Sequence, residues 1–243
     1  MIPLQDILPA GDAFREGVLL MDGSLPAAAA SQGWLDCPVN AALATVAALL
    51  LLLQLGEFYS LLPSLAGCLI RWRGNIQVEH SIHQRGQRNL MAASALLAFC
   101  LLANRFAVFN PRFVAELSRE WQAAAVAGAA SAYLLLRALL HAPLRPAKMD
   151  RESWKASEHA LFNYFLLMMA VLLPLVGILL VAGCGEGVVR VVTLCICSVA
   201  FLLLLVRKWQ ILGSSCTILG TFLYLCGLEL IPAAALIAAA LAL

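Results

Sequence analysis

Long runs of apolar residues dominate the pattern of this chain. Six runs reach about 17 residues or more, which is the length that a helix needs to cross a hydrocarbon core roughly 30 Å thick. They are Val39–Gly56, Leu90–Phe109, Ala123–Leu140, Ala160–Val181, Val188–Val206 and Thr217–Leu243. Two polar segments, Arg71–Asn89 and His141–Glu158, are the only long connections between runs. The pattern predicts an all-α fold, a polytopic membrane helix bundle with about six transmembrane helices.

Composition supports a membrane location and divides the chain into two parts. Hydrophobic residues make up 63% of the chain and charged residues 12%, whereas soluble domains average roughly 45–50% and about 25%. Residues 1–38 are expected to form an outward-facing N-terminal tail, because the segment is rich in acidic residues and lacks the basic start of a secretory signal. Residues 39–243 are expected to form one transmembrane domain. No basic stretch interleaved with aromatic residues indicates a nucleic-acid partner.

The distribution of Lys and Arg predicts the orientation. The segments after the first, third and fifth runs hold 11 of the 16 basic residues, and the opposite side holds 5. Positively charged loops stay in the cytoplasm. Both termini are therefore expected to face outward, which for a bacterial inner (cytoplasmic) membrane means the periplasm.

The segment Phe58–Trp72 has an amphipathic helical pattern. Leu61, Leu65 and Leu69 share one face with the aromatic ends of the segment, and Ser60 and Ser64 lie on the other face. We expect an amphipathic helix in the cytoplasmic interface of the membrane. The alternative is one long tilted helix over residues 39–70.

Glu229 is the most unusual residue in the apolar runs. It lies in the last run beside Tyr224 and Pro232, and an ionised carboxylate at the centre of a membrane costs roughly 2.5–3.5 kcal/mol. No Lys or Arg is expected at the same depth in the other runs, so burial favours the uncharged acid. Two roles stay open for Glu229: a proton or substrate site, or a polar clamp that fixes helix packing.

Two further features of the apolar runs concern helix geometry. Pro174 is expected to interrupt the fourth helix, and broken helices can mark transport sites. The run Ala123–Ser131 is rich in Ala and Gly, and small residues let helices approach closely in lipid. The third helix is therefore expected to be central.

The glycine-rich segment Gly183–Gly187 joins the fourth and fifth runs. It is expected to form a tight turn rather than a phosphate-binding loop.

Candidate chemistry outside the membrane is limited. His80 and His83 share a helical face, and Glu158 and His159 form a second polar pair on the same predicted side. No metal or cofactor is expected from these four residues, because the spacing is common and the segments are solvated. Cys37 and Cys184 are both expected outside, where a disulfide is one alternative. No set of catalytic residues was identified in the sequence.

The last run carries a resemblance to a known family. The segment Phe222–Pro232, with the sequence Phe-Leu-Tyr-Leu-Cys-Gly-Leu-Glu-Leu-Ile-Pro, resembles the closing signature of an integral membrane family of Bacteroidota called domain of unknown function 4271. Leu172–Leu175 resembles the fourth helix of that family, and the layout of tail, first helix and amphipathic segment is similar. The resemblance implies an inner-membrane location and brings no activity or catalytic residue.

These observations predict a non-enzymatic inner-membrane protein that is a component of envelope biogenesis or of a membrane complex, with the lipid bilayer and other membrane or envelope proteins as partners. Two alternatives remain. One is a proton-coupled transporter or channel that uses Glu229. The other is an enzyme on a lipid-linked substrate that uses His80, His83, Glu158 or His159.

Overall fold

The computed structural model describes residues 34–70, 75, 81–109, 111–141, 149, 151–214 and 216–242. Every regular element in these residues is a helix, which confirms the all-α prediction. The helices are α1 (Pro38–Leu53), α2 (Leu55–Ile70), α4 (Ile82–Arg105), α5 (Arg112–Ala115), α6 (Arg119–His141), α7 (Arg151–Val181), α8 (Glu186–Gly213), α9 (Ile218–Leu225) and α10 (Ile231–Ala242), with short turns η2 (Trp34–Asp36) and η3 (Cys226–Leu230). Most of the predicted N-terminal tail, residues 1–33, lies outside the described residues.

Five or six helices of the described residues are long and apolar enough to cross a membrane, so the predicted number of six crossings stays a prediction. By length and composition, five helices of the described residues can cross a membrane: α4, α6, α7, α8 and the continuous helix Ile218–Ala239 formed by α9, η3 and α10. The pair α1 and α2 passes the same test together and makes a sixth span if it is counted as one. The chain is a helical membrane protein.

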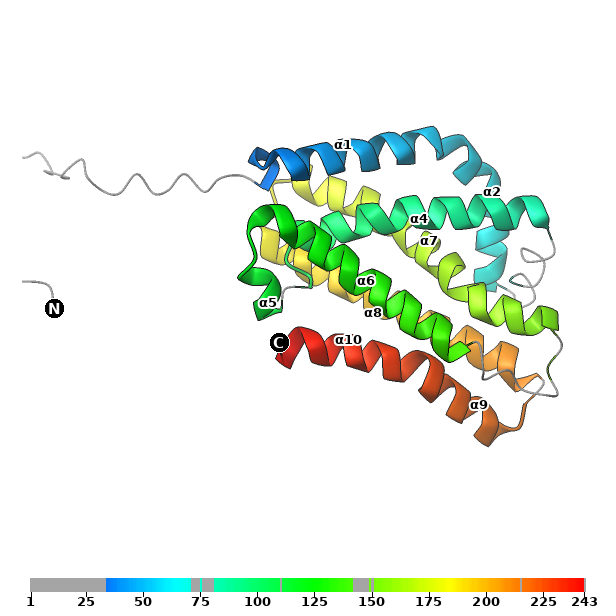
Figure 1. Ribbon diagram of the computed structural model, residues 1–243. Coiled ribbons are helices and arrows are strands. Elements are labelled where there is room, and N and C mark those ends of the chain that lie inside the picture. The colour runs from blue at the N-terminus through cyan, green and yellow to red at the C-terminus, as the bar shows by residue number, and fades with distance from the viewer. Residues whose placement is uncertain are drawn as a thin grey trace, which may run out of the picture.

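Successive spans run antiparallel (Figure 1). The beginnings of α1 and α8 and the ends of α4 and α10 lie at one end of the bundle, which we call the Trp34 end after the first residue of η2. The opposite end, where α6 stops, is called the His141 end. The turn between α7 and α8 is short because α8 starts where α7 finishes. It is a Schellman turn: Gly183 has a φ of +71°, and the Cys184 amide donates to the Leu179 carbonyl at 3.0 Å. The predicted tight turn is confirmed.

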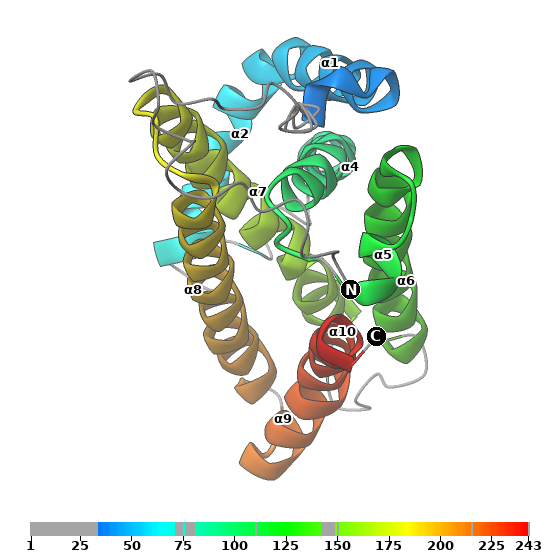
Figure 2. The ribbon, with the colours of Figure 1, turned by 90° about the vertical axis from the view of Figure 1, so that its left-hand side faces the viewer.

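The centre of the bundle consists of α4 and α7, with α1, α6 and α8 around them (Figure 2). Met91 and Ala95 of α4 pack with Met169 and Leu172 of α7 in the main hydrophobic core. The prediction that the third helix is central is wrong, because α6 lies at the edge and Leu135 is 62% exposed. The alanines of α4 supply the small packing face instead, so the backbone of α4 can approach its neighbours closely.

Helices α1 and α2 are separate elements that meet at an angle of 65°. Gln54 lies at the bend, and its side-chain amide donates to the Ser94 hydroxyl of α4 at 2.7 Å. Leu61 and Leu65 of α2 are buried in the core. The alternative of one long tilted helix is therefore wrong, and the predicted separate amphipathic helix is present. Its place at a membrane interface stays a prediction.

Several helices extend beyond their apolar runs. Helix α7 begins at Arg151 and α8 continues to Gly213, so Glu158, His159 and Lys208 lie in helices rather than in connections. The prediction that Pro174 interrupts its helix is wrong, because α7 is continuous through this residue. Packing on both sides holds the helix together although proline removes one backbone hydrogen bond.

Candidate functional site

Glu229 lies in an irregular turn within the last span. Residues Cys226–Leu230 form a π-helical turn, in which the Ile231 amide donates to the Cys226 carbonyl five residues earlier. Pro232 follows directly and has no amide hydrogen to give. A π turn accommodates one additional residue and changes which side chains face inward. Leu228 and Glu229 both point into the bundle here, and Glu229 is only 1% exposed.

Three side chains from two other helices contact the Glu229 carboxylate. Arg137 of α6 donates to Oε1 through Nε at 3.1 Å and through Nη2 at 3.0 Å. The Lys208 ammonium of α8 donates to the same oxygen, and His141 Nε2 lies 3.4 Å from it. We call these four residues the ion cluster. The prediction that no cation lies at the depth of Glu229 is wrong, because Arg137 and Lys208 belong to helices and not to loops.

The ion cluster is sealed from solvent, and the Glu229 carboxylate finds its partners within it. Arg137 is 4% exposed, and Lys208 and Glu229 are 1% exposed each. Arg137 Nη2 also donates to the Glu158 carbonyl at 2.9 Å. Two cations thus share the Glu229 carboxylate, and four helical segments are joined. This geometry suits an ionised Glu229, not the uncharged acid that the sequence suggested.

An apolar and aromatic layer covers the His141 end of the ion cluster. The Trp154 ring lies 5.3 Å from the His141 ring and 6.2 Å from the Tyr224 ring, measured between centroids. Trp154 packs there with Met149, Ile211, Leu212 and Leu228. The layer keeps water from the charges, which strengthens their attraction. Tyr224, a candidate from the sequence, therefore lies against the ion cluster without contacting its carboxylate.

The second predicted polar set, His80, His83, Glu158 and His159, forms no metal-binding group among its described members. His80 lies outside the described residues, and His83 is exposed on α4. Glu158 and His159 lie on α7, and only the backbone carbonyl of Glu158 bonds to the ion cluster. No group of three or more His, Cys, Asp or Glu side chains within the described ranges could hold a metal ion. Cys37 and Cys184, like the other six cysteines, are free thiols.

Sequence reasoning missed three members of the ion cluster. Arg137 and His141 are four residues apart and therefore share one face of a helix. Lys208 is followed by Trp209, Ile211 and Leu212, so the apolar pattern of α8 continues beyond it. A buried carboxylate needs a cationic partner. Together with the spacing of Arg137 and His141 and the apolar residues after Lys208, this requirement could have identified the partners of Glu229.

A second polar contact region ties α2 to the His141 end. The Tyr164 hydroxyl of α7 donates to the Cys68 carbonyl at 2.9 Å, and the Asn163 amide donates to the Asn75 side-chain carbonyl at 2.8 Å. Arg207 of α8 donates to the Leu69 carbonyl. The bonds from Tyr164 and Arg207 satisfy backbone carbonyls at the end of α2, which have no partner within the helix. They hold α2 in place and offer no chemistry of their own.

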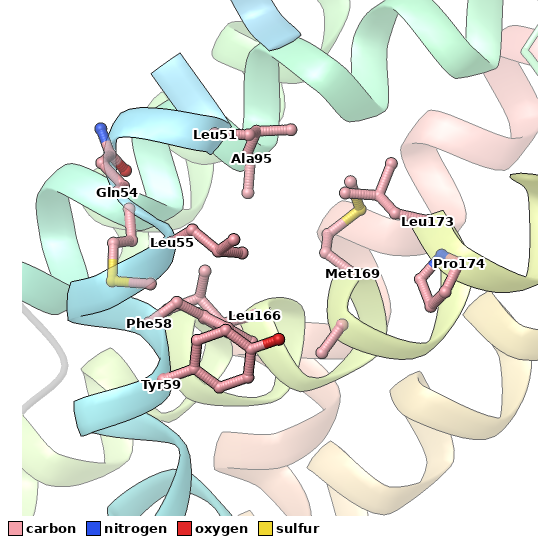
Figure 3. Close-up of a pocket in the computed structure, with 12 residues that line it drawn as sticks. Leu51, Gln54, Leu55, Phe58, Tyr59, Ala95, Leu166, Met169, Leu173 and Pro174 are labelled. Carbon is pink, nitrogen blue, oxygen red and sulfur yellow. The ribbon is translucent and has the colours of Figure 1, made fainter. Parts of the chain in front are cut away.

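The bundle also contains apolar cavities that do not include the ion cluster, and two of them are relevant to function. The first, of about 310 Å³, is lined by Leu55 and Phe58 of α2, by α1 and α4, and by Leu173 and Pro174 of α7 (Figure 3). The second, of about 420 Å³, is lined by residues of α4, α6, α7, α8 and α10. Tyr133 and Leu204 line the second cavity one helical turn before Arg137 and Lys208. The ion cluster thus lies beside an apolar space within the bundle.

Comparison of the chain with protein-family models, with curated proteins and with solved structures found no match.

Proposed function

We propose that this protein is a non-enzymatic, multi-pass component of a bacterial inner membrane, and that it acts as a membrane-embedded partner of other envelope proteins. The ion cluster is in this view a structural clamp. It joins α6, α8 and the last span, and the backbone of α7, into one rigid body.

One observation carries this proposal. The Glu229 carboxylate contacts Arg137, Lys208 and His141, and all four side chains are buried. A proton carrier has to exchange protons with water, whereas this carboxylate is held by two cations beneath an aromatic layer. The contacts therefore favour the clamp over the proton-coupled transporter. For the enzyme alternative, no described group of side chains combines a nucleophile, a base and an accessible pocket.

The location within the cell rests on charge and on resemblance. Arg137 and Lys208 are buried and are left out of the loop count. Nine basic residues then remain on the side of the His141 end, and five lie on the opposite side. This excess favours a cytoplasmic His141 end and periplasmic termini. The resemblance of Phe222–Pro232 to the Bacteroidota family supports the inner membrane.

One experiment distinguishes a structural role of Glu229 from a role as proton carrier. Glu229→Gln is compared with the wild-type protein in proteoliposomes, with pH-dependent flux and thermal stability measured on the same preparation. The clamp predicts a lower melting temperature and no flux for either protein. Flux that appears in the wild type and disappears in a fully folded Glu229→Gln protein would establish the transporter.

Partners and orientation are tested separately. Purification from native membranes in several detergents is expected to return the same envelope proteins each time, and return of the chain alone would contradict the partner role. Two variants that retain only Cys184 or only Cys216 test the orientation with a membrane-impermeant thiol reagent on intact cells. Cys184 lies at the Trp34 end and Cys216 at the His141 end, and only Cys184 is expected to react.

A further inference from the structure

The larger apolar cavity lies where two spans diverge. Helix α8 packs against α9 at the His141 end, whereas α10 packs against α6. Helices α8 and α10 therefore separate toward the Trp34 end (Figure 2). The cavity of about 420 Å³ occupies this space, and we call it the α8–α10 cleft. Its volume falls in the range of roughly 300–1,000 Å³ that is typical of small-molecule sites.

The lining of the α8–α10 cleft suits a hydrocarbon chain. Phe201 of α8, Leu161 of α7 and Ile237 of α10 are among its apolar side chains. Two of the hydroxyl groups in the lining are already used internally: Ser198 donates to the Leu194 carbonyl at 2.8 Å, and Tyr164 donates to the Cys68 carbonyl. Groups engaged in this way do not attract a polar ligand. An apolar chain needs no hydrogen bond and fills such a space favourably.

An arginine lies at the Trp34 end of the same face of α8. Arg190 is four residues before Leu194, which lines the α8–α10 cleft, so the two side chains share a face about 6 Å apart along the helix. Arg190 is exposed, and it makes no hydrogen bond or ion pair with any described residue. Glu186, one turn away, is bound to Arg105 instead, at 2.6 Å. A cation that has no partner among the described residues thus lies at one end of an apolar cleft.

An apolar cleft with an arginine at one end suits an amphiphilic ligand that has an apolar chain and a negatively charged head group. A phosphate pairs well with an arginine guanidinium, and an acyl chain fits the lining described above. The bilayer supplies molecules with both parts at the required depth. We propose that the α8–α10 cleft binds one acyl chain of an anionic phospholipid, whose phosphate contacts Arg190. This inference is independent of the proposed function, because it does not involve the ion cluster.

The first test measures lipid binding to the full chain. Purified, delipidated protein is titrated with phosphatidylglycerol or with phosphatidylcholine, and bound lipid is counted by native mass spectrometry. We expect one tightly held phosphatidylglycerol. Arg190→Gln should weaken its binding about fivefold, the effect of roughly one cation beside an anionic lipid, and Arg190→Lys should keep most of it. Equal binding of the two lipids, or an unchanged Arg190→Gln protein, would overturn the proposal.

The second test fills the cleft. Ala233→Phe places a ring in the α8–α10 cleft, and Ala170→Phe places the same ring in the cavity of Figure 3 as the matched control. Only Ala233→Phe should lose the bound lipid. Should Ala233→Phe not fold, a phosphatidylglycerol with a photoreactive acyl chain is crosslinked to the wild type. Crosslinks to Phe201 or Ile237 are expected, and crosslinks only outside the cleft would overturn the proposal.

Discussion

Removing the charge of Glu229 should destabilise the whole bundle. Glu229→Gln keeps the shape of the side chain but leaves Arg137 and Lys208 without a carboxylate. Loss of one partner from a buried pair costs about 3–5 kcal/mol, and we expect about 3 kcal/mol because the glutamine oxygen still accepts one hydrogen bond. For a chain of this size, each kcal/mol changes the melting temperature by roughly 2–4 °C. The expected decrease is therefore about 6–12 °C.

The assay is thermal unfolding in detergent, followed by size-exclusion chromatography of the fluorescently tagged protein. Glu186→Gln is the matched control, because the ion pair with Arg105 has side chains 36% and 65% exposed. Such a surface pair contributes about 0–1 kcal/mol, so the control should change the melting temperature by less than about 4 °C.

A double-mutant cycle tests whether Glu229 acts through its cations. Lys208→Met combined with Glu229→Gln removes one charge of each sign. The combined loss of stability should be smaller than the sum of the single losses by about 1–2 kcal/mol. Additive effects, or an unchanged melting temperature for Glu229→Gln, would refute the clamp.

Three further substitutions test local features of the fold by the same thermal assay. Gly183→Ala should destabilise by about 1 kcal/mol because its φ is +71°, whereas Gly185→Ala, at a φ of −62°, should have little effect; equal effects would contradict the proposed turn. Tyr164→Phe should cost about 1 kcal/mol by leaving a carbonyl of α2 unpaired, and an unchanged stability would show that this bond is dispensable. Ser94→Ala should cost about 1 kcal/mol because it removes the partner of the Gln54 amide at the bend, and no loss would mean that the bend does not need this bond.

The sequence predicted the spans well because each depends on a long local pattern. The runs Leu90–Phe109 and Val188–Val206 lie almost wholly within α4 and α8. The separate helix α2 was predictable too, since Leu61 and Leu65 recur at helical spacing and are buried in the core. Local pattern and tertiary packing agree in these elements.

The ion cluster was only partly predictable because it depends on distant contacts. Glu229 stood out as a charge in an apolar run, but Arg137 and Lys208 lie at the margins of their runs. Charged residues at such margins usually face the membrane surface, where long side chains reach water. Here they face inward, toward a carboxylate 92 and 21 residues later in the chain. The π turn that aims Glu229 inward has no pattern of its own apart from the following Pro232.

The order in which the parts of the ion cluster are made has a consequence for assembly. During synthesis, α6 and α8 enter the membrane with Arg137 and Lys208 before Glu229 exists. The nascent bundle therefore holds two cations without the carboxylate that both of them contact in the finished protein. Insertion of the last helix, with Glu229 on its inner face, supplies this carboxylate. A chain cut before Glu229 would lack it, which distinguishes unfinished copies from finished ones inside the membrane.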